Sequence, residues 1–149
     1  MRLTENFTLE EFTFSQTAIR KQIDNTPNQK IIKNIKALCV NVLQPLRNKL
    51  KRPIIITSGY RSEALNLKIG GAVNSQHCLG EAADIIIPNV QPVDLFSYII
   101  TNEIKYDQVI LEFNKWVHIS YRKKILRHNT LLAKHEDGDV VYEEFMRIA

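Results

Sequence analysis

The longest amphipathic pattern in the chain runs from Asn28 to about Leu50. Apolar residues recur there every three or four positions, at Ile31, Ile32, Ile35, Leu38, Cys39, Val42, Leu43, Leu46 and Leu50. This is the spacing of one face of an α-helix, so we predict a main packing helix that Pro45 kinks or interrupts. Upstream, Thr8-Leu9-Glu10-Glu11-Phe12 has the form of a capping box and predicts a short first helix.

Strand patterns follow the long helix. The β-branched run from Pro53 to Thr57 stops at Ser58-Gly59, which predicts a buried strand ending in a tight turn. Further strands are predicted at Glu81 to Ile87, Asp107 to Phe113 and Trp116 to Tyr121, the last two joined by a hairpin turn at Asn114-Lys115. One or two helical turns are predicted at Ser62 to Leu67, and a second substantial helix at Pro92 to about Glu103.

The end of the chain predicts one more hairpin. Leu131 to Lys134 and Val140 to Glu143 flank the turn sequence Glu136-Asp137-Gly138-Asp139. Helices early and strands later favour an α+β domain with a mainly antiparallel sheet flanked by helices. The 149 residues contain no linker, repeat or low-complexity segment, so we expect residues 1–149 to form a single domain.

Composition narrows the class of protein. Hydrophobic residues make up 44% and charged residues 24% of the chain, which is ordinary globular usage. No run approaches the roughly 18 apolar residues that a membrane span needs, so no membrane partner is expected. The N-terminal Met-Arg-Leu-Thr-Glu-Asn-Phe lacks the apolar core of a signal peptide. We therefore expect a cytoplasmic protein, or one that reaches the cell exterior by a route not encoded here.

The net charge of +4 suits an anionic partner, either a nucleic acid or an anionic cell wall. Basic residues are scattered apart from one cluster, Arg122, Lys123 and Lys124, and no basic stripe is interleaved with aromatics. Nucleic acid is therefore not the expected partner. The two cysteines, Cys39 and Cys78, lie in dissimilar contexts and argue against a disulfide framework.

Three side chains have the chemistry of a metal site. His77 ends a loop, Asp84 follows in a strand of small and apolar residues, and His118 lies in the strand Trp116 to Tyr121. A carboxylate among apolar neighbours is costly to bury unless a cation or hydrogen bonds compensate it. Strand alternation places His118 and Ser120 on one face and their neighbours on the other.

Other interpretations of these residues stay open at this level. A histidine in a strand is more often a core or surface residue than a ligand, and Asp84 could simply accept backbone hydrogen bonds. The spacing is not one of the short motifs that indicate zinc by themselves. Cys78 adjoins His77, but neighbours on an extended chain point in opposite directions, so we expect Cys78 to pack rather than bind metal. His128 and His135 are expected to be solvated.

Sequences around these residues resemble a known family. The stretches Ile56-Thr57-Ser58-Gly59-Tyr60-Arg61-Ser62, Ser75-Gln76-His77 with Gly80, Ala82 and Asp84, and Trp116-Val117-His118-Ile119-Ser120 resemble the zinc D-Ala-D-Ala carboxypeptidases. That family includes carboxypeptidases, dipeptidases and phage endolysins, with a hedgehog-type fold. The resemblance extends to Asn6 to Phe12 and Asp24 to Pro27 and covers about residues 6–121, which leaves 122–149 as a C-terminal extension.

The resemblance implies roles for individual residues. His77, Asp84 and His118 would be the zinc ligands, and Arg61 would stabilise charge on the substrate carbonyl or hold its carboxylate. Arg61 could also be an ordinary surface or helix-capping residue. Ser75 and Gln76 would line the cleft, although ordering of their loop explains them equally well.

The general base departs from the family pattern. Many relatives carry an acid three residues before the last histidine ligand, where this chain has Lys115. Glu112, at the end of the preceding strand, is the nearest carboxylate, and we predict it as the base, with an ordinary exposed strand-end acid as the alternative. Asp107 is a weaker candidate and is expected to be a turn or strand-start residue.

The resemblance implies zinc-dependent hydrolysis of D-alanine-containing peptide bonds in bacterial peptidoglycan, as a carboxypeptidase or endopeptidase. The compact domain without a signal peptide favours a phage or prophage endolysin-like enzyme, expected to be a monomer. One rival is a non-catalytic cell-wall-binding module that keeps the metal but has lost the base. A second is a basic phage protein that binds nucleic acid.

Overall fold

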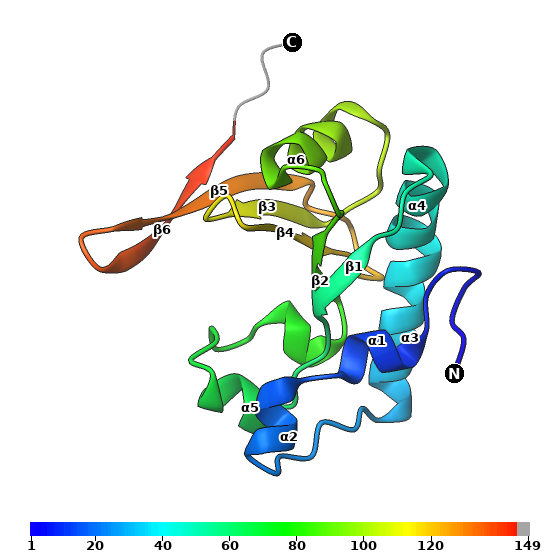
Figure 1. The fold of residues 1–149 in the computed structure, drawn as a ribbon, viewed down its shortest axis with the longest axis vertical. Helices are drawn as coiled ribbons and strands as arrows, with labels where there is room; N and C mark the ends of the chain where they lie inside the picture. Colours follow the sequence, from blue (N-terminus) through cyan, green and yellow to red (C-terminus); the bar gives the residue numbers. More distant parts are fainter. Residues whose placement is uncertain (146–149) are drawn as a thin grey trace.

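The computed structural model describes residues 1–145 and shows one mixed sheet with helices around it (Figure 1). The six strands are β1 (Ile55–Ser58), β2 (Ala82–Ile86), β3 (Gln108–Glu112), β4 (Trp116–Ser120), β5 (Asn129–Glu136) and β6 (Asp139–Glu144). They lie in the order β1-β2-β4-β3-β5-β6, and only the β3–β5 pair is parallel. The predicted α+β class with a mainly antiparallel sheet is confirmed.

The long predicted helix is present and contains an irregularity at the predicted place. It consists of α3 (Gln29–Leu38), the π-helical turn η1 (Cys39–Leu43) and α4 (Gln44–Leu50). Asn28 caps its start by accepting a hydrogen bond from the Ile31 N–H. Pro45 has no N–H to donate to the carbonyl four residues earlier, and the helix widens into the π turn just before it.

Three of the shorter helices match the sequence patterns. They are α1 (Leu9–Thr13), α5 (Glu63–Lys68) and α6 (Pro92–Thr101). Helix α2 (Gln16–Arg20) and the 3₁₀ turn η2 (Gln76–Leu79) were not predicted. The predicted capping box at α1 is confirmed, since the Thr8 N–H donates to the Glu11 carboxylate at 2.6 Å. Helices α1, α2 and α5 gather below the sheet, and α6 lies on the opposite side, above it (Figure 1).

Strand alternation separates a core face of the sheet from a functional face. On β2, β3 and β4 the core receives Ala83, Ile85, Val109, Leu111, Val117 and Ile119, which pack with apolar residues of α3, α4 and α6. The alternate positions of the same strands, among them Asp84, Ile110, Glu112 and His118, face the other way. The predicted separation of His118 from Val117 and Ile119 is confirmed.

The β3–β4 turn lies one residue earlier than predicted. Its central residues are Phe113 and Asn114, both with left-handed φ (57° and 54°), and the Lys115 N–H donates to the Glu112 carbonyl. The prediction of Asn114-Lys115 was wrong because two left-handed residues match the twist of paired strands, and here they are Phe113 and Asn114. The C-terminal hairpin is confirmed as β5–β6, turning at Asp137-Gly138. The last part of the extension, residues 146–149, lies outside the described residues.

Both cysteines are free thiols, as predicted. Cys39 is fully buried in the core, and burial, with a smaller contribution from the negative charge of Glu11, raises its pKa to about 12. Within residues 1–145, none of the helices combines the length and the apolar character that crossing a bilayer demands.

Candidate metal centre

Three elements deliver the predicted ligands to one point. Asp84 and His118 are directly opposed on the antiparallel strands β2 and β4, so their side chains project from the same face. His77 comes from η2, which Ser75 begins by accepting a hydrogen bond from the His77 N–H. Gly80, with φ of 72°, then turns the chain into β2.

The three donor atoms form a small triangle. His77 Nε2 lies 3.2 Å from His118 Nδ1 and 3.3 Å from Asp84 Oδ1, and His118 Nδ1 lies 3.1 Å from the same oxygen. Zinc bonds of about 2.0–2.1 Å would place ligand atoms about 3.3–3.4 Å apart at the corners of a tetrahedron. The triangle therefore has nearly the dimensions of one face of a tetrahedral zinc site.

His77 presents a lone pair to this point. His77 Nδ1 lies 2.7 Å from the Gly59 carbonyl oxygen, which can only accept, so Nδ1 carries the proton and Nε2 presents its lone pair to the site. Such an outer hydrogen bond fixes the tautomer and orientation of a ligand histidine. All three residues are buried, and a cation bound between their ligand atoms would compensate the buried carboxylate.

Electrostatics favour the metal-binding protonation states of His77 and Asp84. Burial lowers the pKa of His77, which favours the neutral imidazole. Burial by itself raises the pKa of Asp84, but its close contacts with His118 and His77 outweigh burial and hold the pKa well below the ordinary value. Neutral imidazoles and an ionised carboxylate are the forms that bind metal.

Arg61 lies against this triangle. Its Nη2 atom is 3.7 Å from Asp84 Oδ2, and the side chain is only 14% exposed, so the surface interpretation is wrong. Its Nε donates to Ser58 Oγ and its Nη1 to Asn66 Oδ1, at 3.3 and 3.1 Å. The buried Asn66 also donates to the Ala72 carbonyl, so it joins Arg61 to the 70–75 loop.

Glu112 lies on the other side of the triangle. It pairs with Trp116 and projects from the same face as His118, with 3.6 Å between Glu112 Oε1 and His118 Nδ1. Its side chain is 15% exposed, so it is not an ordinary exposed strand-end acid. Burial raises the pKa of Glu112, and the negative charge of Asp84 adds to this effect. Lys115, in contrast, is an exposed turn residue.

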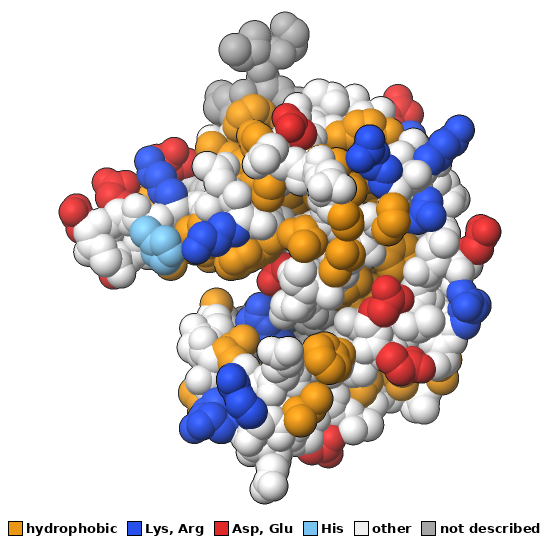
Figure 2. All heavy atoms as spheres, in the orientation of Figure 1, with side chains coloured by type: hydrophobic (Ala, Val, Ile, Leu, Met, Phe, Trp, Pro, Cys, Tyr) orange, Lys and Arg blue, Asp and Glu red, His pale blue; other side chains and the backbone are white. Residues whose placement is uncertain are grey.

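The triangle opens into a cleft of about 540 Å³. Figure 2 shows the molecule deeply hollowed between the β5–β6 hairpin and the part that carries α2 and α5. The lining includes Arg61, Ser75, Gln76, His77, Glu112 and His118, together with Arg127, Leu131 and Tyr142. Ser75 and Gln76 thus line the cleft and also order their loop, which leaves both interpretations of them correct.

One comparison with known proteins decides the family. The family model described as Peptidase M15 matches residues 5–120, most of the chain. The chain belongs to the peptidase M15 family. This confirms the resemblance to zinc D-Ala-D-Ala carboxypeptidases seen in the three motifs, and it supports a metal-dependent peptidase. No curated protein matches the chain closely.

Sequence reasoning missed several residues of this M15 site. Asp107 lies directly before β3, as the strand-start interpretation predicted, but it is fully buried and accepts hydrogen bonds from Arg127 and Gln76. Asn66, Arg127 and Tyr142 were not considered. The segment 122–144 carried no motif that could place it at the cleft, since its position depends on β5 pairing with β3.

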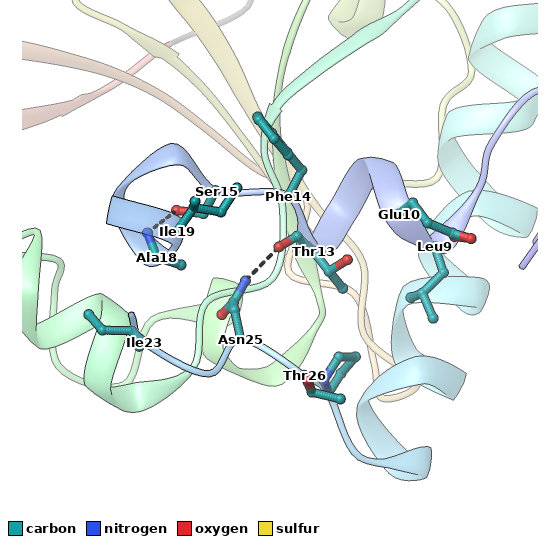
Figure 3. A pocket seen from close by; sticks show the side chains of 11 residues that line it. Leu9, Glu10, Thr13, Phe14, Ser15, Ala18, Ile19, Ile23, Asn25 and Thr26 are labelled. Atoms are coloured by element: carbon teal, nitrogen blue, oxygen red, sulfur yellow. Dashed lines mark hydrogen bonds between the residues drawn. The ribbon is translucent and has the colours of Figure 1, made fainter. Parts of the chain in front are cut away.

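A second hollow in this M15 domain is separate from the metal triangle. It encloses about 410 Å³ between α1, α2 and residues 23–27, and is lined largely by apolar side chains such as Phe14, Ile19 and Ile23 (Figure 3). Within its wall, Asn25 donates to the Thr13 carbonyl and Ser15 caps α2. None of the three predicted ligands lines it.

Proposed function

We propose that this M15 chain is a zinc peptidase that hydrolyses D-alanine-containing peptide bonds of bacterial peptidoglycan. The observation that carries the proposal is the triangle of His77 Nε2, His118 Nδ1 and Asp84 Oδ1, with all edges between 3.1 and 3.3 Å. Membership of the M15 family supports the peptidase activity and a peptidoglycan peptide as substrate.

The donor set fits zinc. Two imidazole nitrogens and one carboxylate oxygen are typical catalytic zinc ligands, and three protein ligands leave a coordination position open. Zinc held there would supply a Lewis acid and make a water molecule acidic enough to act as a nucleophile near neutral pH.

The residues around the triangle can carry the remaining steps. Glu112, buried at the mouth of the cleft beside His118, is placed to take a proton from the attacking water and return it to the departing amine. Arg61 is placed to donate hydrogen bonds to the substrate carbonyl oxygen as negative charge develops on it. Arginine suits this task because it stays protonated and can bind two oxygens.

The position of Glu112 favours an enzyme over the rival binding module. That rival rested on Lys115 occupying the usual acidic position, but a buried carboxylate lies 3.6 Å from His118 Nδ1 in its place. The basic cluster of Arg122, Lys123 and Lys124 does not line this cleft.

The decisive test is incubation of purified protein with peptidoglycan, with and without a chelator, followed by mass spectrometry of the released fragments. We expect fragments cut at a bond next to D-alanine, absent with chelator and restored by added zinc. Zinc-loaded protein that releases nothing would overturn the enzyme and favour the binding module. Retention on a nucleic-acid column that falls steeply with salt would instead support the nucleic-acid rival.

A further inference from the structure

The C-terminal segment supplies one wall of the cleft. Arg127, Leu131 and Tyr142 line it, and all three lie after residue 120, where the family match ends. Parallel pairing of β5 with β3 places Leu131 beside Ile110, and β6 then brings Tyr142 opposite Ala133. The loop of residues 70–75 lines the same cleft.

Arg127 is held rigidly at this wall. Its Nη2 lies 2.6 Å from Oδ2 of the fully buried Asp107 and donates to Gln76 Oε1 at 3.2 Å, while its Nε also contacts Asp107. Nη1 makes no hydrogen bond or ion pair with residues 1–145, and the side chain is 40% exposed. A pre-oriented guanidinium with spare donors in a cleft is suited to bind a carboxylate.

Arg127 belongs to a polar cluster around Asp107. Arg122 also contacts the Asp107 carboxylate, at 3.2 Å, so two guanidinium groups share one acid. Glu81 is the other acid beside the cluster, where it accepts from Gln76. Arg127 is the member of this group that combines a charge with exposure to the cleft.

Tyr142 extends the wall towards Glu112. Its side chain is 54% exposed, and burial raises the pKa of its hydroxyl, helped by the negative charges of Glu112 and Asp84. The phenol is therefore a protonated hydrogen-bond donor at neutral pH. The acids of the hairpin are absent from the cleft lining; Glu143, for example, pairs with Lys134 at 2.7 Å outside it.

The cleft wall presents guanidinium donors to a ligand. Among residues 1–145, the charged side chains that line the cleft are Arg61, Arg127 and the acid Glu112, while Asp84 and Asp107 contact the two arginines from outside the lining. We infer that the wall built by residues 121–144 recognises a peptide bearing a carboxylate, which Arg127 pairs with while Tyr142 donates to the peptide backbone. This inference rests on the proposed function and adds the substrate class. The carboxylate could be the C-terminus of the peptide or a free side carboxylate of the stem.

Three synthetic peptides separate the two sources. One is a stem pentapeptide ending in D-alanyl-D-alanine with a γ-linked D-glutamate. The second has the glutamate α-carboxylate amidated, and the third has the C-terminus amidated. Cleavage rates and binding by calorimetry are measured for wild type, Arg127→Lys, Tyr142→Phe and the double variant Arg127→Gln/Asp107→Asn. The double variant avoids leaving the buried Asp107 charge unpaired.

We expect the Arg127 variants to lose about tenfold or more in kcat/KM on the unmodified peptide, mainly through KM. On one of the two amidated peptides these variants should match wild type, and that peptide identifies the carboxylate. Tyr142→Phe should lose roughly threefold to tenfold, whereas the control Tyr98→Phe, on α6 outside the cleft, should behave as wild type.

An equal loss on all three peptides would show that Arg127 acts only structurally and would overturn the inference. No loss on any peptide would do the same. If wild type cleaves none of them and releases no fragment from peptidoglycan, the proposed function fails. Calorimetry then still tests the inferred carboxylate binding. Wild type that binds the unmodified peptide more tightly than an amidated one, with this difference lost in the Arg127 variants, would support the inference. Equal binding of all three peptides by wild type would overturn it.

Discussion

Asp84 and His118 are directly opposed residues on β2 and β4, and His118 Nδ1 lies 3.1 Å from Asp84 Oδ1. Their backbones are joined by the antiparallel ladder, so strand pairing fixes both side chains on one face before any metal binds. His77 needs only to reach this preformed pair, and its hydrogen bond to the Gly59 carbonyl orients it to do so.

Replacing one member of this pair should remove the metal. Asp84→Asn keeps the shape but loses the negative charge, so we expect zinc content well below one equivalent by elemental analysis. Saturating zinc should stabilise wild type by about 4 kcal/mol at a thousandfold excess over Kd, and the variant much less. His135→Ala, at an exposed histidine outside the triangle, is the control. Full zinc binding by Asp84→Asn would contradict the assignment.

Removing the proposed base should separate catalysis from metal binding. Glu112→Gln is expected to lower kcat by about 10²–10⁴-fold because it cannot accept a proton, while zinc content stays unchanged. Lys115→Ala should retain wild-type rates, since Lys115 is exposed in the turn. A Glu112→Gln variant with undiminished hydrolysis would require another base.

Asn66 should act through Arg61. Asn66→Ala removes the acceptor for Arg61 Nη1 and the donor to the Ala72 carbonyl, and should cost about 1–3 kcal/mol of stability. We also expect a fall in kcat, because Arg61 loses its orientation. Asn66→Asp keeps the acceptor and should recover part of the rate in steady-state assays, whereas Asn48→Ala, at an exposed asparagine, should leave rates unchanged. Equal rates for Asn66→Ala and wild type would refute the link.

Two adjacent glycines offer a matched pair for the same link. A Cβ at Gly71 would lie 2.0 Å from Asn66 Oδ1 and 2.9 Å from Arg61 Nη1, so Gly71→Ala must displace both groups and should lower activity. At Gly70 a Cβ has open space, but φ is 74°, so Gly70→Ala should cost about 1 kcal/mol of stability with little change in activity. Thermal denaturation and rate measurements on both variants test whether only Gly71→Ala lowers activity.

Acid should destabilise the fold through Asp107. Burial raises the pKa of this carboxyl, but the hydrogen bonds and charge of Arg127 outweigh burial and hold the pKa below the ordinary value. The folded state therefore binds the proton less readily than the unfolded chain. Stability from this group is complete above roughly pH 4, the pKa of an unfolded aspartate, and is lost as pH falls through the lower folded pKa.

Asp107→Asn tests this linkage. At neutral pH the variant should be less stable by about 1.5 kcal/mol, because the partly exposed Arg127 loses its charged hydrogen-bond acceptor. Urea denaturation across acid pH should show a shallower loss of stability in the variant than in wild type. Parallel pH profiles for the two proteins would show that Asp107 does not carry the dependence.

Local patterns in the sequence were enough to predict most elements of this fold. The apolar spacing from Ile31 to Leu50 and the capping box at Thr8 each depend on residues within a few positions of one another. The β-branched run from Pro53 to Thr57 predicted strand β1, but its predicted burial was wrong, because β1 lies at the edge of the sheet with exposed and half-buried residues. The Phe113-Asn114 turn was misplaced by one residue because short turns differ little in sequence, and the pairing of the flanking strands selects among them.

The amino-acid sequence by itself determined most helices and strands and the family. It also singled out His77, Asp84 and His118 as predicted ligands, because residue chemistry and motif order are properties of the chain. Only the tertiary structure decided that Glu112 lies beside His118, that Asn66 holds Arg61, and that Arg127 and Tyr142 line the cleft. These contacts join residues on different elements, so they depend on strand order and register, which no local pattern specifies.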